Sequence, residues 1–341
     1  MKLWAGSQKR YPGSRAGMKI GFLALLIVAI SGGFVLIHRY EEPPPLIAVV
    51  PRTTGSTLWE NERAGVDAAA REWRYRTYWN APTHEDDISG QIHLLEKVRA
   101  GPYAGLILAP DHALALLTII RETLAAGKPV VIISSRLALP PRGDLSYVIT
   151  DQKQMGKLAA ARIGQALHGT GTVAVLGIDP GIAGIASRQR AFEAALQSEY
   201  PSIRIVARGP GAFNAAEAQE SLIGALTAHP QLSAVFALTA VSTRAAYFTL
   251  KSSGKSSRTT LVGCEQDSDM INFVRAGKIN AVLAEDTYRM GYLAVREIHA
   301  RLSHRQVPPV TILPPVLVTR ENASSARISR MVDYYQGEPA L

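Results

Sequence analysis

Cysteine is almost absent from this chain of 341 residues, which contains Cys264 and no other. No intrachain disulfide can form, so stability in an oxidising compartment has to come from core packing. Cys264 ends the apolar segment Leu261–Cys264, a context typical of a small buried residue rather than a reactive thiol. We therefore expect Cys264 to lie in a hydrophobic core.

The short motifs that mark common catalytic and nucleotide-binding sites are also missing. The chain has no G-x-S-x-G, H-E-x-x-H or G-x-G-x-x-G, and its eight histidines are scattered. The glycine-rich segment 177–181 lacks the Lys-Ser/Thr of a phosphate-binding loop. The run His84–Asp87 has metal-binding residue types, but consecutive residues in a polar loop seldom converge on one ion, so we interpret it as the solvated start of a helix. We predict no enzyme activity, no cofactor and no metal site.

Acidic residues are absent before Glu41, and no charged residue of either sign occurs between Ile20 and Ile37. This run of about 18 residues would form a helix of roughly 27 Å, close to the thickness of the bilayer hydrocarbon. The residues before it carry only positive charge, and the positive-inside bias then places this end of the chain in the cytoplasm. The basic residues concerned are Lys2, Lys9, Arg10, Arg15 and Lys19.

A cleaved signal peptide has the same order of charges as a membrane anchor. The apolar run is longer than the usual signal-peptide core, and neither a clear A-x-A site nor a lipobox cysteine follows it, which favours an uncleaved anchor. Cleavage and a start at Met18 stay open as alternatives. We expect a cytoplasmic segment at 1–19, a transmembrane helix at 20–37, a linker at 38–45 and a domain on the periplasmic or extracellular face.

The formal net charge of +9 does not predict a nucleic-acid partner. Residues 1–46 hold six Lys or Arg and two Glu, or +4, which leaves +5 for the rest of the chain. That charge is spread over about 295 residues with no recognition motif. A segment of this length is enough for two compact lobes.

From Leu46 onward, short apolar runs rich in β-branched residues alternate with amphipathic stretches of helix length. This alternation predicts an α/β fold with two successive doubly wound parallel-sheet lobes joined by a hinge. The expected strands are Ile47–Val50, Gly105–Leu108, Pro129–Ser134, Thr172–Leu176, Ile203–Ala207, Ala234–Leu238, Thr259–Cys264 and Asn280–Ala284. The expected helices are 59–74, 112–126, 152–167, 187–199, 215–228, 241–253, 268–276 and 289–302, and Asp151 has the type and place of a helix N-cap.

Ligands of doubly wound sheets bind beyond the carboxyl ends of the strands. The segments at these positions match those of a known family in the same order along the chain. They include Ser56–Trp59, Gly127–Ser134, Thr150–Gln152, Arg188–Phe192, His229–Pro230, Leu261–Glu265, Ala284–Tyr292 and Leu317–Asn322. In these segments the chain resembles the type I periplasmic solute-binding proteins, specifically the ribose-binding-like sugar-binding group related to the ligand domains of LacI-type repressors.

The resemblance implies two lobes joined by three crossovers, near Thr150, Glu285 and Pro309. It implies an N-terminal lobe of 46–150 plus 286–309 and a C-terminal lobe of 151–285 plus 310–323, with 324–341 as a loosely ordered tail or a strand covering a lobe. It also implies ligand contacts from Ser56, Leu58, Trp59, Ser134, Ser135, Arg136, Arg188, Thr239, Glu265 and Glu285.

The chain departs from the family at several of these positions. Family members often have Asp in place of Ser134, Asn in place of Thr239, Asp in place of Glu265 and Gln or Asn in place of Glu285, whereas Arg188 is kept and Trp59 keeps aromatic character. Trp59 offers a flat face to the C–H groups of a sugar, Arg188 offers donors and the two glutamates offer acceptors. Two carboxylates also suit an amine-bearing ligand, and the sequence leaves both ligand classes open.

Each of these residues also has a structural interpretation. Trp59 can pack its helix on the sheet, Arg188 can be an exposed helix charge, Glu265 and Glu285 can form salt bridges between the lobes, and Ser134 and Ser135 can turn the chain.

We expect an extracytoplasmic protein that captures a small polar ligand and presents it to an ABC permease. A monosaccharide is the favoured ligand. The main alternative is a sensor domain that feeds a chemotaxis or histidine-kinase system, for which permanent tethering is natural. A LacI-like repressor is disfavoured because residues 1–46 hold a membrane segment where a helix-turn-helix would lie. A hydrolase on this fold is a distant further alternative.

Overall fold

The computed structural model describes Met1, residues 43–54 and residues 57–332 of the chain. The described residues from Pro45 to Val332 belong to one compact unit. The expected membrane segment, residues 20–37, lies outside the described residues. Among the residues that are described, no helix combines the length and the apolar character needed to cross a bilayer.

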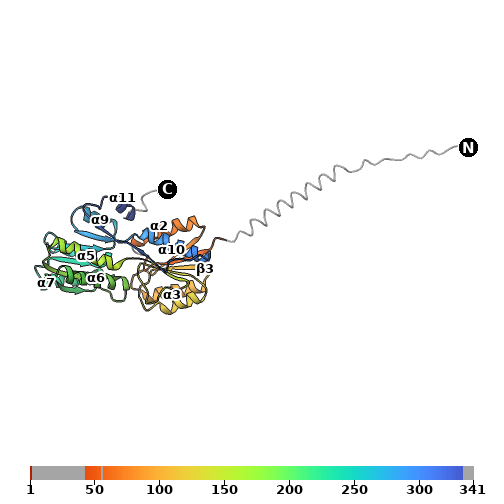
Figure 1. Cartoon of the computed structure of the whole chain (residues 1–341), viewed down its shortest axis with the longest axis horizontal. Coiled ribbons are helices and arrows are strands. Elements are labelled where there is room, and N and C mark those ends of the chain that lie inside the picture. Colours follow the sequence, from red (N-terminus) through yellow and green to blue (C-terminus); the bar gives the residue numbers. More distant parts are fainter. Residues whose placement is uncertain (2–42, 55–56, 333–341) are drawn as a thin grey trace. The chain divides into compact units, whose positions relative to one another are not determined.

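The first lobe is a six-stranded, fully parallel sheet in the order β11-β5-β4-β3-β1-β2. Figure 1 shows α2 and α10 on one side of this sheet and α3 on the other. Helices α2 and α10 cover one face and α3 and α4 the other, so that both faces of the central strands are buried. The strands are β1 (Leu46–Val50), β2 (Arg76–Trp79), β3 (Tyr103–Leu108), β4 (Val130–Ile133), β5 (Leu145–Thr150) and β11 (Val310–Leu313); the helices are α2 (Thr57–Glu72), α3 (Ile88–Ala100), α4 (Leu117–Ala125) and α10 (Thr287–Leu302).

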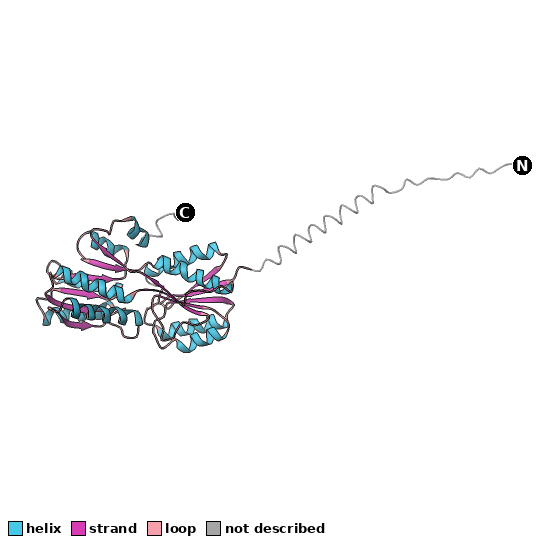
Figure 2. Cartoon of the chain, viewed as in Figure 1, coloured by secondary structure: helices cyan, strands magenta, loops and turns pink. Residues whose placement is uncertain are grey.

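The second lobe repeats this plan in the order β12-β10-β9-β8-β6-β7, and of its described strands only β12 is antiparallel to its neighbour. In both lobes helices flank the strands (Figure 2). Helices α5 and α6 pack on one face, and α7, α8, α9 and α11 on the other. The strands are β6 (Gly171–Leu176), β7 (Ile203–Gly209), β8 (Ala234–Ala237), β9 (Thr260–Cys264), β10 (Ala281–Ala284) and β12 (Val316–Thr319); the helices are α5 (Gln152–Ala166), α6 (Ala183–Glu199), α7 (Ala215–Ala228), α8 (Ala240–Ser252), α9 (Ser268–Arg275) and α11 (Ala326–Val332).

The expected fold class, two doubly wound parallel-sheet lobes, is therefore confirmed. Alternate residues of each central strand enter opposite cores, as in β6, where Val173 packs with α5 and α6 while Ala174 packs with the helices of the other face. Asp151 caps α5 as expected, since its side chain accepts a hydrogen bond from Gln154 N at 2.9 Å. Cys264 is fully buried, also as expected.

The chain passes between the lobes three times: from β5 into α5, from β10 into α10, and from β11 into β12. The third passage lies later than expected. Residues Val310–Leu313, which we assigned to the C-terminal lobe, pair in parallel with β5 of the first sheet. The passage itself is the dipeptide Pro314–Pro315.

The end of the chain is also more structured than expected. Residues 326–332 form helix α11 and not a loosely ordered tail or a strand, because Ile328 and Met331 are buried in the core of the second lobe. Asn61, on α2 of the first lobe, donates to the carbonyls of Met331 at 3.0 Å and Val332 at 3.3 Å. Helix α11 thus belongs to one lobe by packing and contacts the other by hydrogen bonds.

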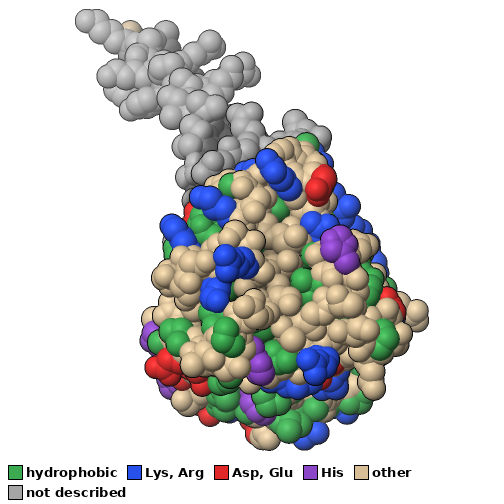
Figure 3. Space-filling view, turned by 90° about the vertical axis from the view of Figure 1, so that its left-hand side faces the viewer, with side chains coloured by type: hydrophobic (Ala, Val, Ile, Leu, Met, Phe, Trp, Pro, Cys, Tyr) green, Lys and Arg blue, Asp and Glu red, His purple; other side chains and the backbone are tan. Residues whose placement is uncertain are grey.

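Basic side chains on the outer end of the second lobe are dispersed over the face seen in Figure 3 and do not gather into one patch.

Candidate functional site

A cavity of about 870 Å³ lies between the two lobes, at the carboxyl ends of their strands. The first lobe contributes Thr53, after β1, and residues 83–86, between β2 and α3. The second lobe contributes the residues that follow β7, β8 and β9. These are Phe213–Ala216 and Gln219, then Thr239–Val241, Arg244, Ala245 and Phe248, then Glu265 and Asp267.

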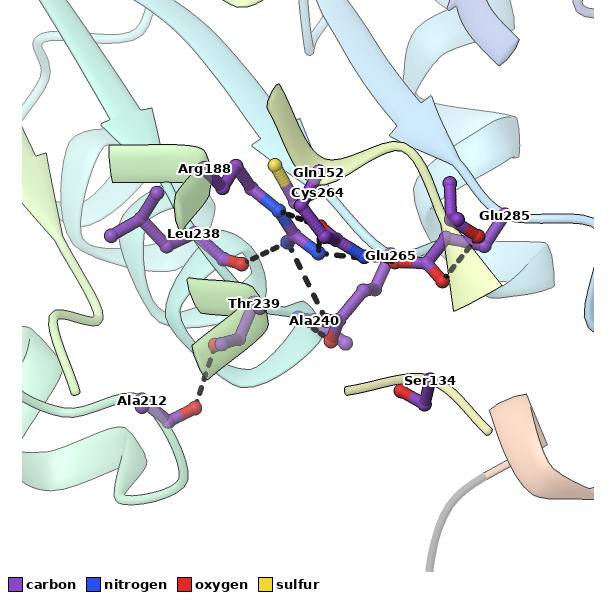
Figure 4. A network of polar contacts seen from close by, with 12 residues as sticks. Ser134, Gln152, Arg188, Ala212, Leu238, Thr239, Ala240, Cys264, Glu265 and Glu285 are labelled. Atoms are coloured by element: carbon purple, nitrogen blue, oxygen red, sulfur yellow. Dashed lines mark hydrogen bonds and ion pairs between the residues drawn. The ribbon is translucent and has the colours of Figure 1, made fainter. Parts of the chain in front are cut away.

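Arg188 lies at the centre of a buried polar network beside this cavity (Figure 4). Helix α6 carries it, and every nitrogen of its guanidinium donates to the protein. Nε and Nη2 donate to Gln152 Oε1 at 2.9 and 2.7 Å, and Nη1 donates to the carbonyl of Leu238. Nη2 also reaches Glu285 Oε1 at 3.0 Å, and Nη1 reaches Glu265 Oε1 at 3.5 Å.

The Glu285 carboxylate connects two of the three passages between the lobes. Its Oε2 accepts from Thr150 Oγ1 at 2.8 Å and its Oε1 accepts from Gln152 Nε2 at 3.0 Å, while its own backbone is held by Gln266. Since Glu285 is only 4 % exposed, its negative charge has to be balanced locally, and Arg188 provides the balance. Both Glu285 and Arg188 are therefore engaged with the protein in this arrangement.

Glu265 is bound less tightly and lines the cavity. Its backbone has a φ of 61°, a left-handed conformation that is uncommon for a residue with a side chain. Its Oε2 accepts from Ala240 N at 3.2 Å, at the start of α8, where the helix dipole favours an anion. Thr239, the N-cap of α8, also lines the cavity and donates through Oγ1 to Ala212 O at 2.6 Å.

An arginine that our sequence reasoning did not single out occupies the space between the lobes. The guanidinium carbon of Arg52 lies 5.2 Å from the ring centroid of Trp59 and 5.5 Å from that of Phe213. Trp59 belongs to the first lobe and Phe213 to the second, so Arg52 stands between one aromatic ring from each. Its Nε lies 3.9 Å from Glu85 Oε2, and the Trp59 indole Nε1 donates to Glu85 Oε1 at 3.5 Å.

After β4, Ser134 turns the chain and Ser135 contacts the second lobe. Ser134 has a φ of 62°, and its Oγ is 3.5 Å from Arg52 Nη2. Ser135 Oγ accepts from Gly184 N, in the second lobe, at 3.0 Å. Arg136 is exposed and lies over the ring of Tyr147, with 5.4 Å between its guanidinium carbon and the ring centroid.

The two other expected contact residues are placed only in part. Ser56 lies outside the described residues, and Leu58 falls in the first turn of α2, where its backbone alone is described. Neither position is therefore tested.

The structure agrees only in part with the prediction that His84–Asp87 is the solvated start of a helix. Asp87 does cap α3, through Gly90 N at 2.8 Å, but His84, Glu85 and Asp86 line the cavity. The Glu85 side chain is only 14 % exposed, and burial raises its pKa, an effect that Arg52 opposes. The edge strand β2 places this segment at the cleft, and β2 has no apolar run by which the sequence would reveal it.

Two further carboxyl groups lie near Arg52 with no hydrogen-bond partner for their oxygens among the described residues. These are Asp111, after β3, and Glu62, on α2. Burial raises the pKa of Asp111 to about 9, against the opposing field of Arg52, and raises the pKa of Glu62 well above its usual range for the same reason. The carboxyl group of Asp111 is thus protonated in the folded protein near neutral pH. No cluster of His, Cys, Asp and Glu suited to a metal ion occurs within the described part of the chain.

Two α/β lobes, three connecting passages and a polar cavity at the facing strand ends define a bilobed small-molecule receptor. The match to the periplasmic binding protein domain extends over residues 47–306. The chain therefore belongs to the periplasmic binding protein family, in its type I architecture.

Characterised relatives of the chain are sugar-binding proteins. The D-allose-binding periplasmic protein of Escherichia coli (strain K12) is 22 % identical over 269 residues, covering 76 % of this chain and 86 % of the relative. The ribose import binding protein RbsB of Bacillus subtilis (strain 168) is 24 % identical over 237 residues, with coverages of 70 % and 75 %.

Solved structures share the fold closely. A solute-binding protein from Agrobacterium vitis with bound D-fucose superposes with a TM-score of 0.80 at 25 % identity, covering 84 % of this chain and 99 % of that one. A carbohydrate transporter solute-binding protein from Agrobacterium radiobacter, in complex with D-arabinose, gives a TM-score of 0.80 at 23 % identity, with coverages of 85 % and 99 %.

Proposed function

We propose that this chain is an extracytoplasmic solute-binding protein that captures a sugar or a similar small polar ligand between its lobes and delivers it to an ABC transporter. The observation that carries the proposal is the cavity, which residues at the strand ends of both lobes line and to which Phe213 of the second lobe contributes an aromatic ring. Trp59 is 2 % exposed and lies beside this cavity, across Arg52 from Phe213. Sugar-binding relatives that match over most of their own length support the ligand class.

Binding in such a receptor works by stabilising the closed arrangement of the lobes. A ligand that contacts both lobes shifts the equilibrium toward closure by as much as its affinity differs between the open and closed forms. The lobes of this structure are already in contact, through Ala113 N to Gly181 O at 2.9 Å and Gly184 N to Ser135 Oγ at 3.0 Å. A permease that recognises the closed form would thereby respond to the ligand.

The proposed ligand contacts follow from accessibility to the cavity. Phe213 offers a ring face, Thr239 a hydroxyl and Glu265 a carboxylate at the cavity wall, while Arg188 and Glu285 hold Glu265 and the hinge in place from behind. An unpaired ligand hydroxyl in a closed cleft costs about 1 to 3 kcal/mol, so these polar groups would set specificity. Residues 20–37 are the proposed tether that keeps this receptor at the outer face of the cytoplasmic membrane.

A thermal unfolding screen of the purified full chain, followed by intrinsic tryptophan fluorescence, tests the proposal. The panel contains D-allose, D-ribose, D-arabinose and D-fucose, together with further hexoses, pentoses, amino sugars and polyols. We expect a Tm that rises with ligand concentration, by the equivalent of roughly 2.7 kcal/mol at a hundredfold excess over Kd. Folded protein whose Tm is unchanged by every member of the panel contradicts the proposal.

A matched pair of variants locates the binding site in the same assay. Phe213→Ala removes the aromatic ring of the second lobe at the cavity, whereas Phe248→Ala removes a more exposed ring on α8 farther along the same wall. We expect the first substitution to abolish the ligand-induced rise in Tm and the second to leave most of it. An equal loss in both variants would place the ligand in the outer part of the cavity.

A further inference from the structure

The position of Arg52 indicates which kind of chemical group fits beside the cavity, between Trp59 and the cavity-lining Phe213. Its guanidinium lies within cation–π distance of Trp59 and Phe213, and its side chain is 3 % exposed. Yet its polar contacts are long: 3.5 Å to Ser134 Oγ and 3.9 Å to Glu85 Oε2, and its Nε has no hydrogen-bond partner among the described residues. A cation therefore fills an aromatic-walled space without being firmly held there.

The cavity that continues from this space is rich in carboxylates. Among the described residues that line it are Glu85, Asp86, Glu265 and Asp267, against Arg244 as the one described arginine. Arg244 is already committed, since it contacts Asp267 closely and Asp269 at 3.2 Å. Glu265 and Asp267 are thus paired with Arg188 and Arg244, whereas Glu85 has only the distant Arg52 and is the carboxylate that a ligand cation would gain.

A second buried group points to an alternative position for Arg52. Asp111 is 4 % exposed, both of its carboxyl oxygens lack a partner within the described part of the chain, and Arg52 is the main positive charge acting on it. The other charges acting on Asp111 come from Glu85, Asp86 and Asp87, at the segment before α3. An unpartnered buried carboxyl is costly, and a nearby arginine that changed rotamer would satisfy it.

We propose that the cavity selects a sugar carrying a protonated amine, and that this amine takes the place of the Arg52 guanidinium between Trp59 and Phe213 while Arg52 moves to pair with Asp111. The inference rests on the proposed function and specifies its ligand class. The amine would lie between the two rings and near the Glu85 carboxylate, which is the environment that Arg52 occupies in this structure.

The exchange has a proton balance that can be measured. The carboxyl group of Asp111 is protonated near neutral pH because of its burial, and its pKa is about 9. When Arg52 pairs with it, the carboxyl O–H releases its proton to the solvent and the carboxylate accepts hydrogen bonds from the guanidinium. Binding of the amine should therefore release up to one proton per ligand, in contrast to binding of a neutral sugar that leaves Arg52 in place.

Isothermal titration calorimetry of the full chain tests the inference with matched probes. D-Glucosamine, D-galactosamine and D-mannosamine are each compared with the parent hexose and with the N-acetylated form, in which the amine is neutral. At pH 7 we expect at least one amine to bind tenfold or more tightly than both of its neutral counterparts. Titrations in buffers of different ionisation enthalpy should show proton release for that amine.

Two variants test the residues that the proposed exchange of Arg52 for the amine requires. Glu85→Gln keeps the size of the side chain and removes its charge, and Asp111→Asn removes the carboxylate that would receive Arg52; each should reduce the preference for the amine by threefold or more. Asp111→Asn should also abolish the proton release. Asp269→Asn, an exposed acid not among the cavity-lining residues, is the control and should change neither quantity.

The outcomes separate this inference from the function on which it rests. Neutral hexoses that bind as tightly as the amines overturn the inference and leave the sugar receptor standing. Binding of amines with no proton release, and with no effect of Asp111→Asn, overturns the proposed movement of Arg52. No binding by any of these probes overturns the inference, and the proposed function fails as well only if every member of the thermal unfolding panel leaves Tm unchanged.

Discussion

Replacing Arg188 by Met should destabilise the second lobe strongly. The substitution removes a side chain that is 2 % exposed and leaves the carboxylates of Glu265 and Glu285 buried without a cation. Breaking a buried ion pair by deleting one partner typically costs about 3 to 5 kcal/mol, because the remaining charge stays out of water. Glu285 retains its bonds to Thr150 and Gln152, which softens the loss but does not neutralise the charge.

That loss translates into a measurable shift in stability. At roughly 2 to 4 °C per kcal/mol for a protein of this size, Tm should fall by about 6 to 20 °C. Urea unfolding followed by circular dichroism gives the free energy directly, and Arg190→Met, an exposed arginine on the same helix, is the matched control. The control should change the free energy of unfolding by less than about 0.5 kcal/mol.

A double-mutant cycle shows whether the charge is responsible. Glu285→Gln alone should destabilise the protein, but in the Arg188→Met background it should restore part of the loss, since the amide carries no charge. The reasoning fails if Arg188→Met costs less than about 1 kcal/mol, or if Glu285→Gln is equally harmful in both backgrounds.

Three other perturbations have defined outcomes. Gly65→Ala should destabilise by about 2 kcal/mol or more, because a Cβ there would meet the α10 backbone at 1.9 Å, whereas Gly224→Ala, with nothing within 4 Å, should stabilise by about 0.5 to 1 kcal/mol in chemical denaturation. Between the usual pKa of 3.8 and the folded pKa of about 9, the folded protein keeps the Asp111 proton and the unfolded chain loses it, so the free energy of unfolding of the wild type falls as pH rises. Asparagine does not titrate, so Asp111→Asn should raise Tm little near pH 4 and progressively more toward pH 9. Asn61→Ala should speed amide hydrogen exchange in 326–332, while Glu60→Ala, on the exposed side of α2, should not.

Each of these predictions has a contrary result. Equal effects of the two glycine substitutions would mean that α2 and α10 can separate at little cost. A difference in Tm between Asp111→Asn and wild type that does not change with pH would mean that Asp111 is not protonated in the folded protein. Unchanged exchange in the Asn61 variant would mean that packing alone holds α11.

The sequence predicted the layers of the fold well because the buried central strands are continuous apolar runs. It missed β2, an edge strand of sequence Arg-Thr-Tyr-Trp with no fully buried residue. It also missed β5, where Ser146 is buried inside the strand and satisfied only by Glu297 Oε2, 2.6 Å away and 151 residues distant along the chain. A polar residue paired over such a distance carries no local signal.

The candidate site could be predicted in position more readily than in contacts. The resemblance implied contacts from Thr239 and Glu265, and both residues line the cavity. It gave no indication that Arg52 would stand between two aromatic rings, since Phe213 lies in the other lobe. Nor did it show that Arg188 would be fully engaged by the protein, because its partners are 36 to 97 residues away in sequence.

The passage through Pro314–Pro315 affects the mechanics of the hinge. Each proline fixes its φ torsion, so this connection has fewer free rotations than an ordinary dipeptide. The other two passages are tied together by Glu285, which binds Thr150 and Gln152. We therefore expect the lobes to move by bending about an axis through the three passages more than by twisting. A stiff hinge of this kind loses little conformational entropy when the lobes close. The favourable contacts of the ligand are then offset less, and the affinity is higher.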